Sequence, residues 1–243
     1  MKGIRSFGQW RRGLRRIRAL DREWPGLGTL VRKVGRERLT YLEPDALCDL
    51  AESVRDVEHK AMSGMVVECG CGLGGSAIIL AGAKAPQREL RVFDVFAMIP
   101  PPSEKDGTDA HHRYDEIVGG ESAGIGGDSY YGYESNLHQK VENSFRRLGF
   151  PLVEHNVRLI RGLFEDTLQL DAPVALAHID ADWYESVFTC LQRIEPNMVS
   201  GARLVIDDYD TWSGCRSAVD DFLGSWRGSF YVEQKARLHI VKA

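Results

Sequence analysis

The fold is decided by the stretch Met65-Val66-Val67-Glu68-Cys69-Gly70-Cys71-Gly72-Leu73-Gly74-Gly75-Ser76 (residues 65–76). A short apolar run ends in an acid and a cluster of glycines, and a helix-like run follows at 77–81. In an α/β fold, a strand, a tight glycine turn and a helix start let a cofactor approach bare backbone at the carboxyl end of the first strand. The stretch therefore predicts nucleotide-type binding, and a merely tight strand–helix turn is the alternative.

The acid before the glycines indicates which class of cofactor is bound, a dinucleotide or S-adenosylmethionine. The glycine spacing matches the dinucleotide fingerprint only loosely, and a dinucleotide's pyrophosphate needs backbone amides and a helix N-terminus. S-adenosylmethionine instead carries an ammonium group and ribose hydroxyls, which the carboxylate of Glu68 is able to hold. Glu68, Gly70, Gly72 and Ser76 are therefore the first candidates for binding S-adenosylmethionine.

Strand and helix patterns alternate along the rest of the chain. Further strands are predicted at 89–94, 157–162, 174–180 and 201–208, and a closing hairpin at 230–233 and 237–241. Helices are predicted at 44–60, 134–148, 184–194 and 214–223. This alternation predicts an α/β protein with a mostly parallel seven-stranded sheet, to which the hairpin adds an antiparallel edge.

Length and composition bound the class of protein. The chain has 243 residues, and we expect one domain at 37–243 behind a basic helical arm at 1–36. Its net charge of -4 gives no overall attraction to nucleic acid. No apolar run approaches the ~20 residues of a membrane span and no signal peptide is recognised, so we expect a cytoplasmic protein. Five scattered cysteines predict buried thiols rather than disulfides or a zinc site.

The first 20 residues are basic, with no acid before Asp21. Trp10, Leu14 and Ile17 fall at helical spacing, which predicts a basic amphipathic helix. The basic residues are Lys2, Arg5, Arg11, Arg12, Arg15, Arg16 and Arg18. Such a helix packs on its own domain or on a partner subunit of a homodimer, or it contacts nucleic acid or another anionic surface. We prefer packing on its own domain or on a partner subunit, with the arginines solvated, and we expect a homodimer and no nucleic-acid partner.

Residues 97–135 differ from the rest of the chain because they show no sustained periodicity. They contain three consecutive prolines at 100–102, several glycines, and tyrosines at 130, 131 and 133. A long irregular stretch inside a compact domain is usually a lid, a binding loop or disorder, and the tyrosines argue against disorder. We predict a lid-like insertion that orders over the acceptor, with a static cover packed on the core as the alternative.

Acids stand at the carboxyl ends of the predicted strands, which converge on the crevice where such folds bind ligands. They are Asp94, Asp180, Asp182, Asp207 and Asp208. Asp94 suits a ribose diol, with a helix cap as the alternative. Like charges packed together need a cation or raised pKa values. Oxygen donors from Asp180, Asp207 and Asp208 suit Mg²⁺ or another hard divalent ion, although any one of them alone is a common turn or helix cap.

A set of motifs carries a family resemblance. They are Val-Glu-Cys-Gly…Gly-Gly-Ser (67–76), Phe-Asp (93–94), Gly-x-Phe-x-Asp-Thr-Leu (162–168), Asp-x-Asp-x-Tyr-Glu-Ser (180–186), Asp-Asp-Tyr (207–209) and Gly-Cys-Arg-x-Ala-Val-Asp-x-Phe (214–222). In this order they resemble the macrocin O-methyltransferase family, which includes enzymes acting on novobiocin-type and mycinamicin-type glycosides. The resemblance implies a class I methyltransferase (Rossmann-like) fold, S-adenosylmethionine as donor, a magnesium ion, and methylation of a sugar hydroxyl on a natural product or glycan.

The resemblance also implies roles for single residues. By position, Asp180, Asp207 and Asp208 resemble the family's metal ligands, and Asp182 resembles its proposed general base. His138, on the helix predicted after the insertion, is a weaker candidate for the base, and a solvated helix residue is its alternative. The candidates for binding the donor are Glu68, Gly70, Gly72, Ser76, Asp94, Glu165 and Asp166.

Two segments depart from the family. The run Val95-Phe96-Ala97-Met98-Ile99-Pro100 stands where the family has Ser-Phe-Glu-Gly-Leu-Pro, and the tail lacks the usual Trp-Arg-Lys. Both lie where an acceptor is shaped, so the sequence does not say which small molecule or oligosaccharide is methylated. Two other functions stay open: methylation of a phenolic or catechol hydroxyl, and a non-catalytic S-adenosylmethionine-binding module, against which the intact acidic set speaks.

Overall fold

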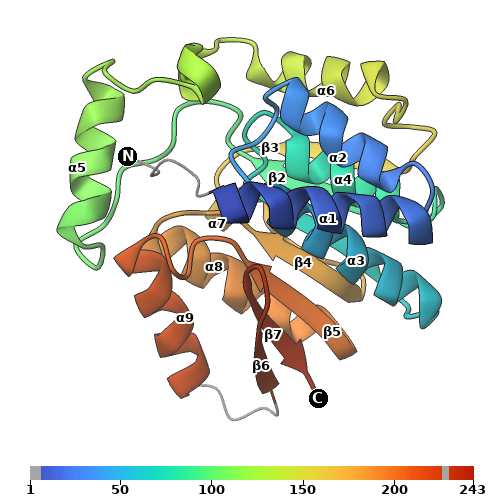
Figure 1. Cartoon of the computed structure of the whole chain (residues 1–243). Helices are drawn as coiled ribbons and strands as arrows, with labels where there is room; N and C mark the ends of the chain where they lie inside the picture. Colours follow the sequence, from blue (N-terminus) through green and yellow to red (C-terminus); the bar gives the residue numbers. More distant parts are fainter. Residues whose placement is uncertain (1–6, 226–229) are drawn as a thin grey trace.

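The glycine strand lies in the middle of a seven-stranded sheet. The computed structural model describes residues 7–225 and 230–243, with side chains from Gly13 onward. Strand β1 (Met65–Cys69) pairs in parallel with β2 (Leu90–Asp94) and β4 (Val174–Ile179). The other strands are β3 (Val157–Arg161), β5 (Met198–Ile206), β6 (Phe230–Gln234) and β7 (Leu238–Lys242). Their order across the sheet is β3-β2-β1-β4-β5-β7-β6, with β7 antiparallel to both neighbours (Figure 1). The mostly parallel sheet with a closing hairpin is confirmed.

Helices cover both faces of this sheet (Figure 1). One face carries α1 (Phe7–Glu23), α2 (Leu27–Arg36), α3 (Pro44–His59), α4 (Gly75–Ala83) and α6 (Leu137–Arg147). The other carries α7 (Phe164–Thr167), α8 (Tyr184–Ile194) and α9 (Ser213–Ser225). The central strands are buried along their whole length, as expected for parallel strands covered on both faces.

Strand periodicity decides which face each side chain of β1 joins. Met65, Val67 and Cys69 pack in the core below α8 and α9, whereas Val66 packs in the core below α3 and α4. Because side chains alternate along a strand, Glu68 lies on the same face as Val66. An acid is thereby placed inside the protein, beneath the start of α4.

The basic arm packs on the domain that follows it. Ile17 and Leu20 of α1 and Val31 and Val34 of α2 belong to the same core as α3 and α4. Arg16 forms an ion pair with Glu52 of α3 at 2.5 Å, while Arg15 and Arg18 are exposed. Lys2 and Arg5 lie outside the described residues, as do the side chains of Trp10, Arg11 and Arg12. For the described part of the arm, the interpretation of packing on its own domain is confirmed.

The prediction of an irregular stretch at 97–135 was wrong in part. Residues Thr108–Val118 form a regular helix, α5, and two short 3₁₀ turns follow at Ile125–Gly127 and Tyr131–Tyr133. Only Ala110 and Ile117 of α5 are buried, so the helix has too narrow an apolar face to produce a sequence period. Because the second 3₁₀ turn extends to Tyr133, α6 begins at Leu137 and not at Glu134, where the helix was predicted to begin.

Two aspartates attach this insertion to the core. Asp106 accepts a hydrogen bond from the amide of Tyr184 at 2.8 Å, at the start of α8. Asp109 accepts hydrogen bonds from the amide and the hydroxyl of Ser213, at 2.9 and 2.6 Å, at the start of α9. Side-chain acceptors at helix N-termini satisfy amides that have no partner within the helix. The first part of the insertion is thus attached to both helices that follow acidic strand ends.

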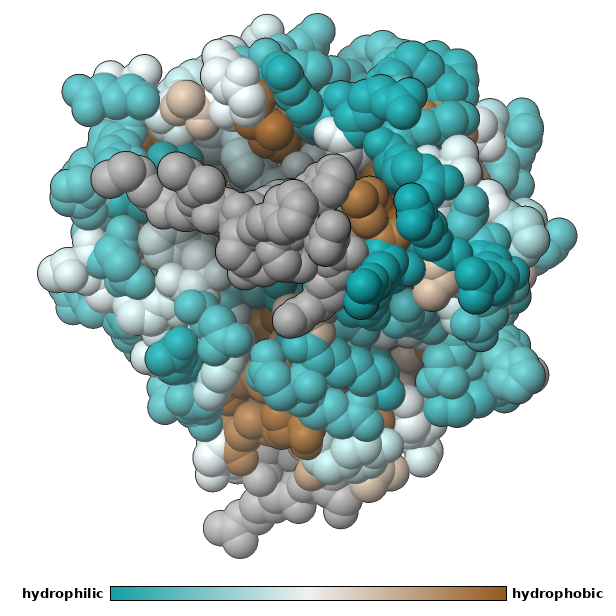
Figure 2. Space-filling model, in the orientation of Figure 1, coloured by the Kyte–Doolittle hydropathy of each residue, from teal (hydrophilic) through white to brown (hydrophobic). Residues whose placement is uncertain are grey.

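The face shown in Figure 2 is mostly hydrophilic, with several separate apolar areas, the largest of them near the lower end of the view. Tyr231 and Val232 of β6 are about half exposed, at 50% and 49%. All five cysteines are buried free thiols, as predicted. Among the described residues, no helix combines the length and the apolar character needed to cross a bilayer.

Candidate functional site

The glycine turn brings the ends of β1 and β4 into contact. Gly70 has φ of 83°, in the left-handed region that favours glycine. A Cβ atom at Gly70 would lie 1.9 Å from the carbonyl oxygen of Asp180. Any other residue there would force the two strand ends apart, so this glycine sets the distance between the turn and Asp180.

Asp94 holds the turn from the end of β2. One oxygen of its carboxylate accepts hydrogen bonds from the amides of Cys71 and Gly72, at 2.7 and 3.0 Å, and the other accepts the amide of Phe96 at 2.6 Å. Burial raises the pKa of Asp94, and the three amides oppose that shift. Asp94 therefore shapes the glycine turn and also lines the cavity described below.

Glu68 and Ser76 support the turn from inside the protein. Glu68 is fully buried, accepts the hydroxyl of Ser76 and lies 2.9 Å from Nδ1 of His178. Neither Glu68 nor Ser76 is among the described residues that line the cavity beside Asp94 and Asp180. The sequence did not single out His178; the signal that finds it is its register position opposite Glu68 on the neighbouring parallel strand.

His178 links the turn to the acidic strand ends. Its Nε2 lies 3.9 Å from Oδ1 of Asp207. Burial acts to lower its pKa, but the carboxylates of Glu68 and Asp207 prevail and raise the pKa of His178 well above its usual value. When protonated, the imidazole of His178 compensates part of the negative charge of the two carboxylates beside it.

The predicted metal ligands converge. One ligand oxygen from each of Asp180, Asp207 and Asp208 lies within 4.8 Å of the others. Burial and the neighbouring carboxylates of Asp207 and Asp208 raise the pKa of Asp180 well above its usual value. These three acids stand at the adjacent ends of β4 and β5, as the sequence predicted.

Arg237, which sequence reasoning missed, reaches the cluster from the turn between β6 and β7. Its Nε donates to Oδ1 of Asp207 at 2.5 Å, and its Nη2 donates to Glu43 before α3 at 3.1 Å. Burial alone would raise the pKa of Asp207, but His178 and Arg237 hold it below its usual value. Asp207 is therefore ionised and fixed, whereas Asp180 bears most of the repulsion within the cluster.

Asp182 follows Asp180 by two residues and has an unusual backbone. Its φ is 55°, in the left-handed region that aspartate tolerates better than most residues. Its Oδ1 accepts a hydrogen bond from the indole Nε1 of Trp212 at 2.8 Å. Trp183 packs edge-on against Trp212 with ring centroids 5.4 Å apart.

A small cavity of about 60 Å³ joins these elements. The lining includes Gly70, Asp94, Glu165, Asp180, Asp182 and Tyr131. The ring of Tyr131 lies over the turn, because a Cβ atom at Gly72 would be 3.6 Å from it. The cavity therefore combines candidate donor-binding residues, a candidate metal ligand and the candidate base.

Two predicted site residues lie elsewhere. His138, on α6, packs its ring edge-on against Phe96 with centroids 4.8 Å apart. Asp166 is exposed on α7. Neither is among the described residues that line the cavity, so the structure brings Glu165 but not Asp166, and Asp182 but not His138, to the acidic strand ends.

The donor set fits a hard divalent cation. Carboxylate oxygens are the ligands that Mg²⁺ prefers in proteins, usually one or two of them with waters. Burial and repulsion from Asp207 and Asp208 raise the pKa of Asp180, and a bound cation would relieve the repulsion. Asp180, Asp207 and Asp208 are the residues that would hold it.

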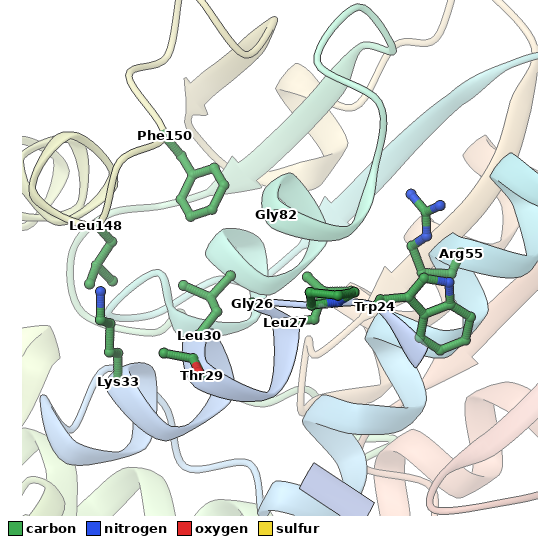
Figure 3. Close-up of a pocket in the computed structure, with 11 residues that line it drawn as sticks. Trp24, Gly26, Leu27, Thr29, Leu30, Lys33, Arg55, Gly82, Leu148 and Phe150 are labelled. Atoms are coloured by element: carbon green, nitrogen blue, oxygen red, sulfur yellow. The ribbon is translucent and has the colours of Figure 1, made fainter. Parts of the chain in front are cut away.

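A second hollow of about 530 Å³ lies at the far end of α4, beside Gly82 (Figure 3). Trp24, Leu30 and Phe150 form apolar walls, and Lys33 extends towards Leu148 (Figure 3). It shares no lining residue with the acidic cavity. The glycine turn and the acids therefore form a separate site.

A model of the macrocin O-methyltransferase family matches residues 10–227. The demethyldecarbamoylnovobiocin O-methyltransferase of Streptomyces niveus is 27% identical over 217 residues, which cover 85% of this chain and 72% of the relative. The 8-demethyl-8-(2,3-dimethoxy-alpha-L-rhamnosyl)-tetracenomycin-C 4'-O-methyltransferase of Streptomyces olivaceus is 32% identical over 216 residues, covering 86% and 73%.

Two solved structures resemble this chain. The O-methyltransferase NovP superposes with a TM-score of 0.68 at 22% identity, covering 84% of this chain and 82% of its own. The calicheamicin methyltransferase CalS11 gives a TM-score of 0.63 at 18% identity, covering 98% and 94%. At these identities the likeness concerns the fold.

Proposed function

Because this chain belongs to the macrocin O-methyltransferase family and is an O-methyltransferase with the class I methyltransferase fold, we propose that it methylates a sugar hydroxyl. The donor in this proposal is S-adenosylmethionine and the cation is Mg²⁺. The observation that carries the proposal is the convergence of Asp180, Asp182, Asp207 and Asp208 beside the glycine turn.

The donor binds at the glycine turn in this proposal. Asp94 and Glu165 are the acids of the cavity that are available for its hydroxyl and ammonium groups. Gly70 and Gly72 allow close approach to the backbone because they carry no Cβ atom. Glu68 supports the turn from behind through Ser76 and His178.

Asp182 removes the proton of the acceptor hydroxyl. As the proton moves to the carboxylate, the acceptor oxygen forms a bond to the methyl carbon and the bond from that carbon to sulfur breaks. The products are a methyl ether and S-adenosylhomocysteine. A cation held by Asp180, Asp207 and Asp208 would lower the pKa of the hydroxyl. Aligning donor and acceptor supplies much of the rate in reactions of this kind.

A sugar acceptor is supported by the names of the relatives. The Streptomyces olivaceus enzyme is named for a dimethoxy-rhamnosyl tetracenomycin, and a second CalS11 structure is described as a TDP-rhamnose 3'-O-methyltransferase. The two names place the sugar on different carriers, tetracenomycin C and TDP. Glycosides and nucleotide sugars are therefore both candidate acceptors.

Methyl transfer from labelled S-adenosylmethionine to panels of glycosides, nucleotide sugars and catechols tests the proposal. We expect transfer to a sugar hydroxyl that stops in EDTA and returns with Mg²⁺. Asp208→Asn should lower kcat about 100-fold or more, while the Kd of S-adenosylhomocysteine changes less than about twofold, because the variant removes a cation ligand and leaves the turn intact.

The outcomes separate the parts of the proposal. Transfer to catechols alone would replace the sugar by a phenolic acceptor. Full activity in EDTA, with metal analysis showing that no metal is retained, would remove the cation from the reaction. Asp210→Asn is the matched control, because Asp210 is exposed on the loop after the cluster, and this variant should behave as the wild type.

A further inference from the structure

We infer that Trp212 is the positioning residue of the base, holding the carboxylate of Asp182 towards the cavity through its indole N–H. The inference rests on the proposed function, in which Asp182 accepts the proton. Its geometric basis is the 2.8 Å hydrogen bond from Nε1 of Trp212 to Oδ1 of Asp182.

The backbone of Asp182 explains why a positioning residue is needed. A φ of 55° is uncommon for a residue with a side chain, and such conformations persist only where the surroundings enforce them. The loop from 180 to 183 is short and leads directly into α8. The loop fixes the backbone of Asp182 but not the torsion angles of its side chain. The hydrogen bond from Trp212 to the carboxylate restricts those torsion angles.

Trp212 is well placed to act as a fixed support. Its amide donates to the carbonyl oxygen of Asp208 at 3.0 Å, one residue before the start of α9. Its ring packs edge-on against Trp183, whose indole donates to the carbonyl oxygen of Pro100 at 2.9 Å. The indole therefore connects the acidic end of β5 to Asp182 and sets the position of the base relative to the cluster.

An alternative role for Trp212 is that of an apolar platform under a sugar ring. The two roles make opposite predictions for Trp212→Phe, which keeps an aromatic ring and removes the N–H. A platform keeps most of its function in phenylalanine, whereas a positioning residue loses the bond through which it acts.

The kinetic test is a double-mutant cycle of Trp212→Phe and Asp182→Asn. We expect Trp212→Phe to lower kcat about 10- to 100-fold, the value of a hydrogen bond to a charged group. The KM of donor and acceptor should change less than about twofold. In the Asp182→Asn background, the same substitution should change kcat less than about twofold. A residue that acts only through the Asp182 carboxylate cannot lower kcat further once that carboxylate has been removed.

Three results would overturn the positioning role: wild-type kcat in Trp212→Phe, losses that multiply in the double variant, or a rise in acceptor KM alone. Trp24→Phe is the matched control for loss of an indole, since Trp24 lines the hollow at the far end of α4, and it should have wild-type kinetics. Thermal unfolding of each variant separates a folding defect from a kinetic one.

A spectroscopic test does not depend on turnover. The chain has five tryptophans, so an ¹⁵N–¹H correlation spectrum contains up to five indole resonances. The resonance that Trp212→Phe removes should be the one that Asp182→Asn shifts most. An unshifted resonance would refute the hydrogen bond. If the wild type transfers no methyl group to any acceptor, the proposed function fails and the positioning role fails with it; if only the variant data disagree, the proposed function stands.

Discussion

At Gly70 a single hydrogen atom in place of a side chain decides how closely two strands approach. The missing Cβ atom would lie 1.9 Å from the carbonyl oxygen of Asp180, and the φ of 83° would strain any other residue. The position of a candidate metal ligand therefore depends on a residue that contributes no functional group. The proposed donor and cation sites therefore meet at this point of backbone contact.

Gly70→Ala should lower the free energy of unfolding by about 2 kcal/mol or more, because the backbone clash adds to the strain of a left-handed alanine. It should also weaken S-adenosylhomocysteine binding. Urea unfolding and isothermal titration measure the two effects. The matched control is Gly35→Ala in α2, where no atom lies within 4 Å of the new methyl group; helix propensity predicts a gain of about 0.5–1 kcal/mol. Equal stability of the two variants would contradict the assigned contact.

At the scale of the elements, the segment before α5 shows how the insertion is attached to the core. Asp106 is buried and accepts the amides of Ser103 and Tyr184, both at 2.8 Å. It thereby serves as a side-chain cap for α8, the helix that directly follows Asp182. The insertion contributes to the site through this cap as well as through Tyr131.

Asp106→Ala should therefore loosen the first turn of α8. We expect a loss of about 1–2 kcal/mol, the usual value of an N-terminal cap, and faster hydrogen exchange at the amide of Tyr184. Asp106→Asn keeps one side-chain oxygen and should show a smaller effect. Unchanged exchange at Tyr184 in the alanine variant would show that the bond does not support the helix.

Because the first part of the insertion is attached to α8 and α9, the lid prediction applies to its second part, residues 119–136. Residues 119–136 follow α5 and include Tyr131, which covers Gly72, and Tyr133, whose hydroxyl donates to the carbonyl oxygen of Ile117 at 2.6 Å. We expect amides at 119–136 to exchange quickly in the free enzyme and slowly with S-adenosylhomocysteine plus acceptor, because a lid orders when ligands bind. Amides near Asp106 should be protected in both states. Equal protection of 119–136 in both states would identify a static cover.

At the scale of the whole molecule, one ion pair connects the end of α3, the loop before β1 and the loop before β2. Glu58 of α3 accepts Nε and Nη2 of Arg88 at 2.6 and 3.2 Å and the amide of Ala85 at 2.9 Å. Arg88 also donates to the carbonyl oxygen of Met62 at 2.9 Å. Burial alone would raise the pKa of Glu58, but Arg88 and the amide of Ala85 hold it below its usual value.

This shift predicts how stability depends on pH. A carboxyl whose pKa is lower in the folded state contributes fully above its unfolded pKa of about 4.3, and the contribution is lost as pH falls through the folded value. Glu58→Gln should cost about 1–2 kcal/mol at pH 7, and the difference from the wild type should shrink as pH falls from about 4.3 through the lower folded pKa of Glu58. Urea unfolding across this range measures it. Glu142→Gln, in the surface pair with Arg146, should differ little at any pH; a constant difference for Glu58→Gln would contradict the mechanism.

The sheet and the acidic cluster were predictable because both depend on local patterns. Apolar runs that end in acids mark the parallel strands, and the carboxyl ends of such strands meet at one edge. The partners of these acids were not predictable, since they depend on register and on distant segments. His178 meets Glu68 only because β4 lies beside β1, and Arg237 meets Asp207 only after the hairpin folds back onto β5. Helix α5 was not predicted because it buries only Ala110 and Ile117, which is too few apolar positions to produce a helical period in the sequence.

The place of β7 between β5 and β6 has a consequence for the order of synthesis. A growing chain releases β6 before β7, so β6 has no neighbouring strand in the sheet until β7 has emerged. Arg237, 30 residues after Asp207, emerges in the same interval. A nascent chain that already contains Asp180, Asp207 and Asp208 therefore lacks the arginine that balances Asp207. Asp207 therefore gains its arginine partner only when the hairpin closes, after all three acids have been translated.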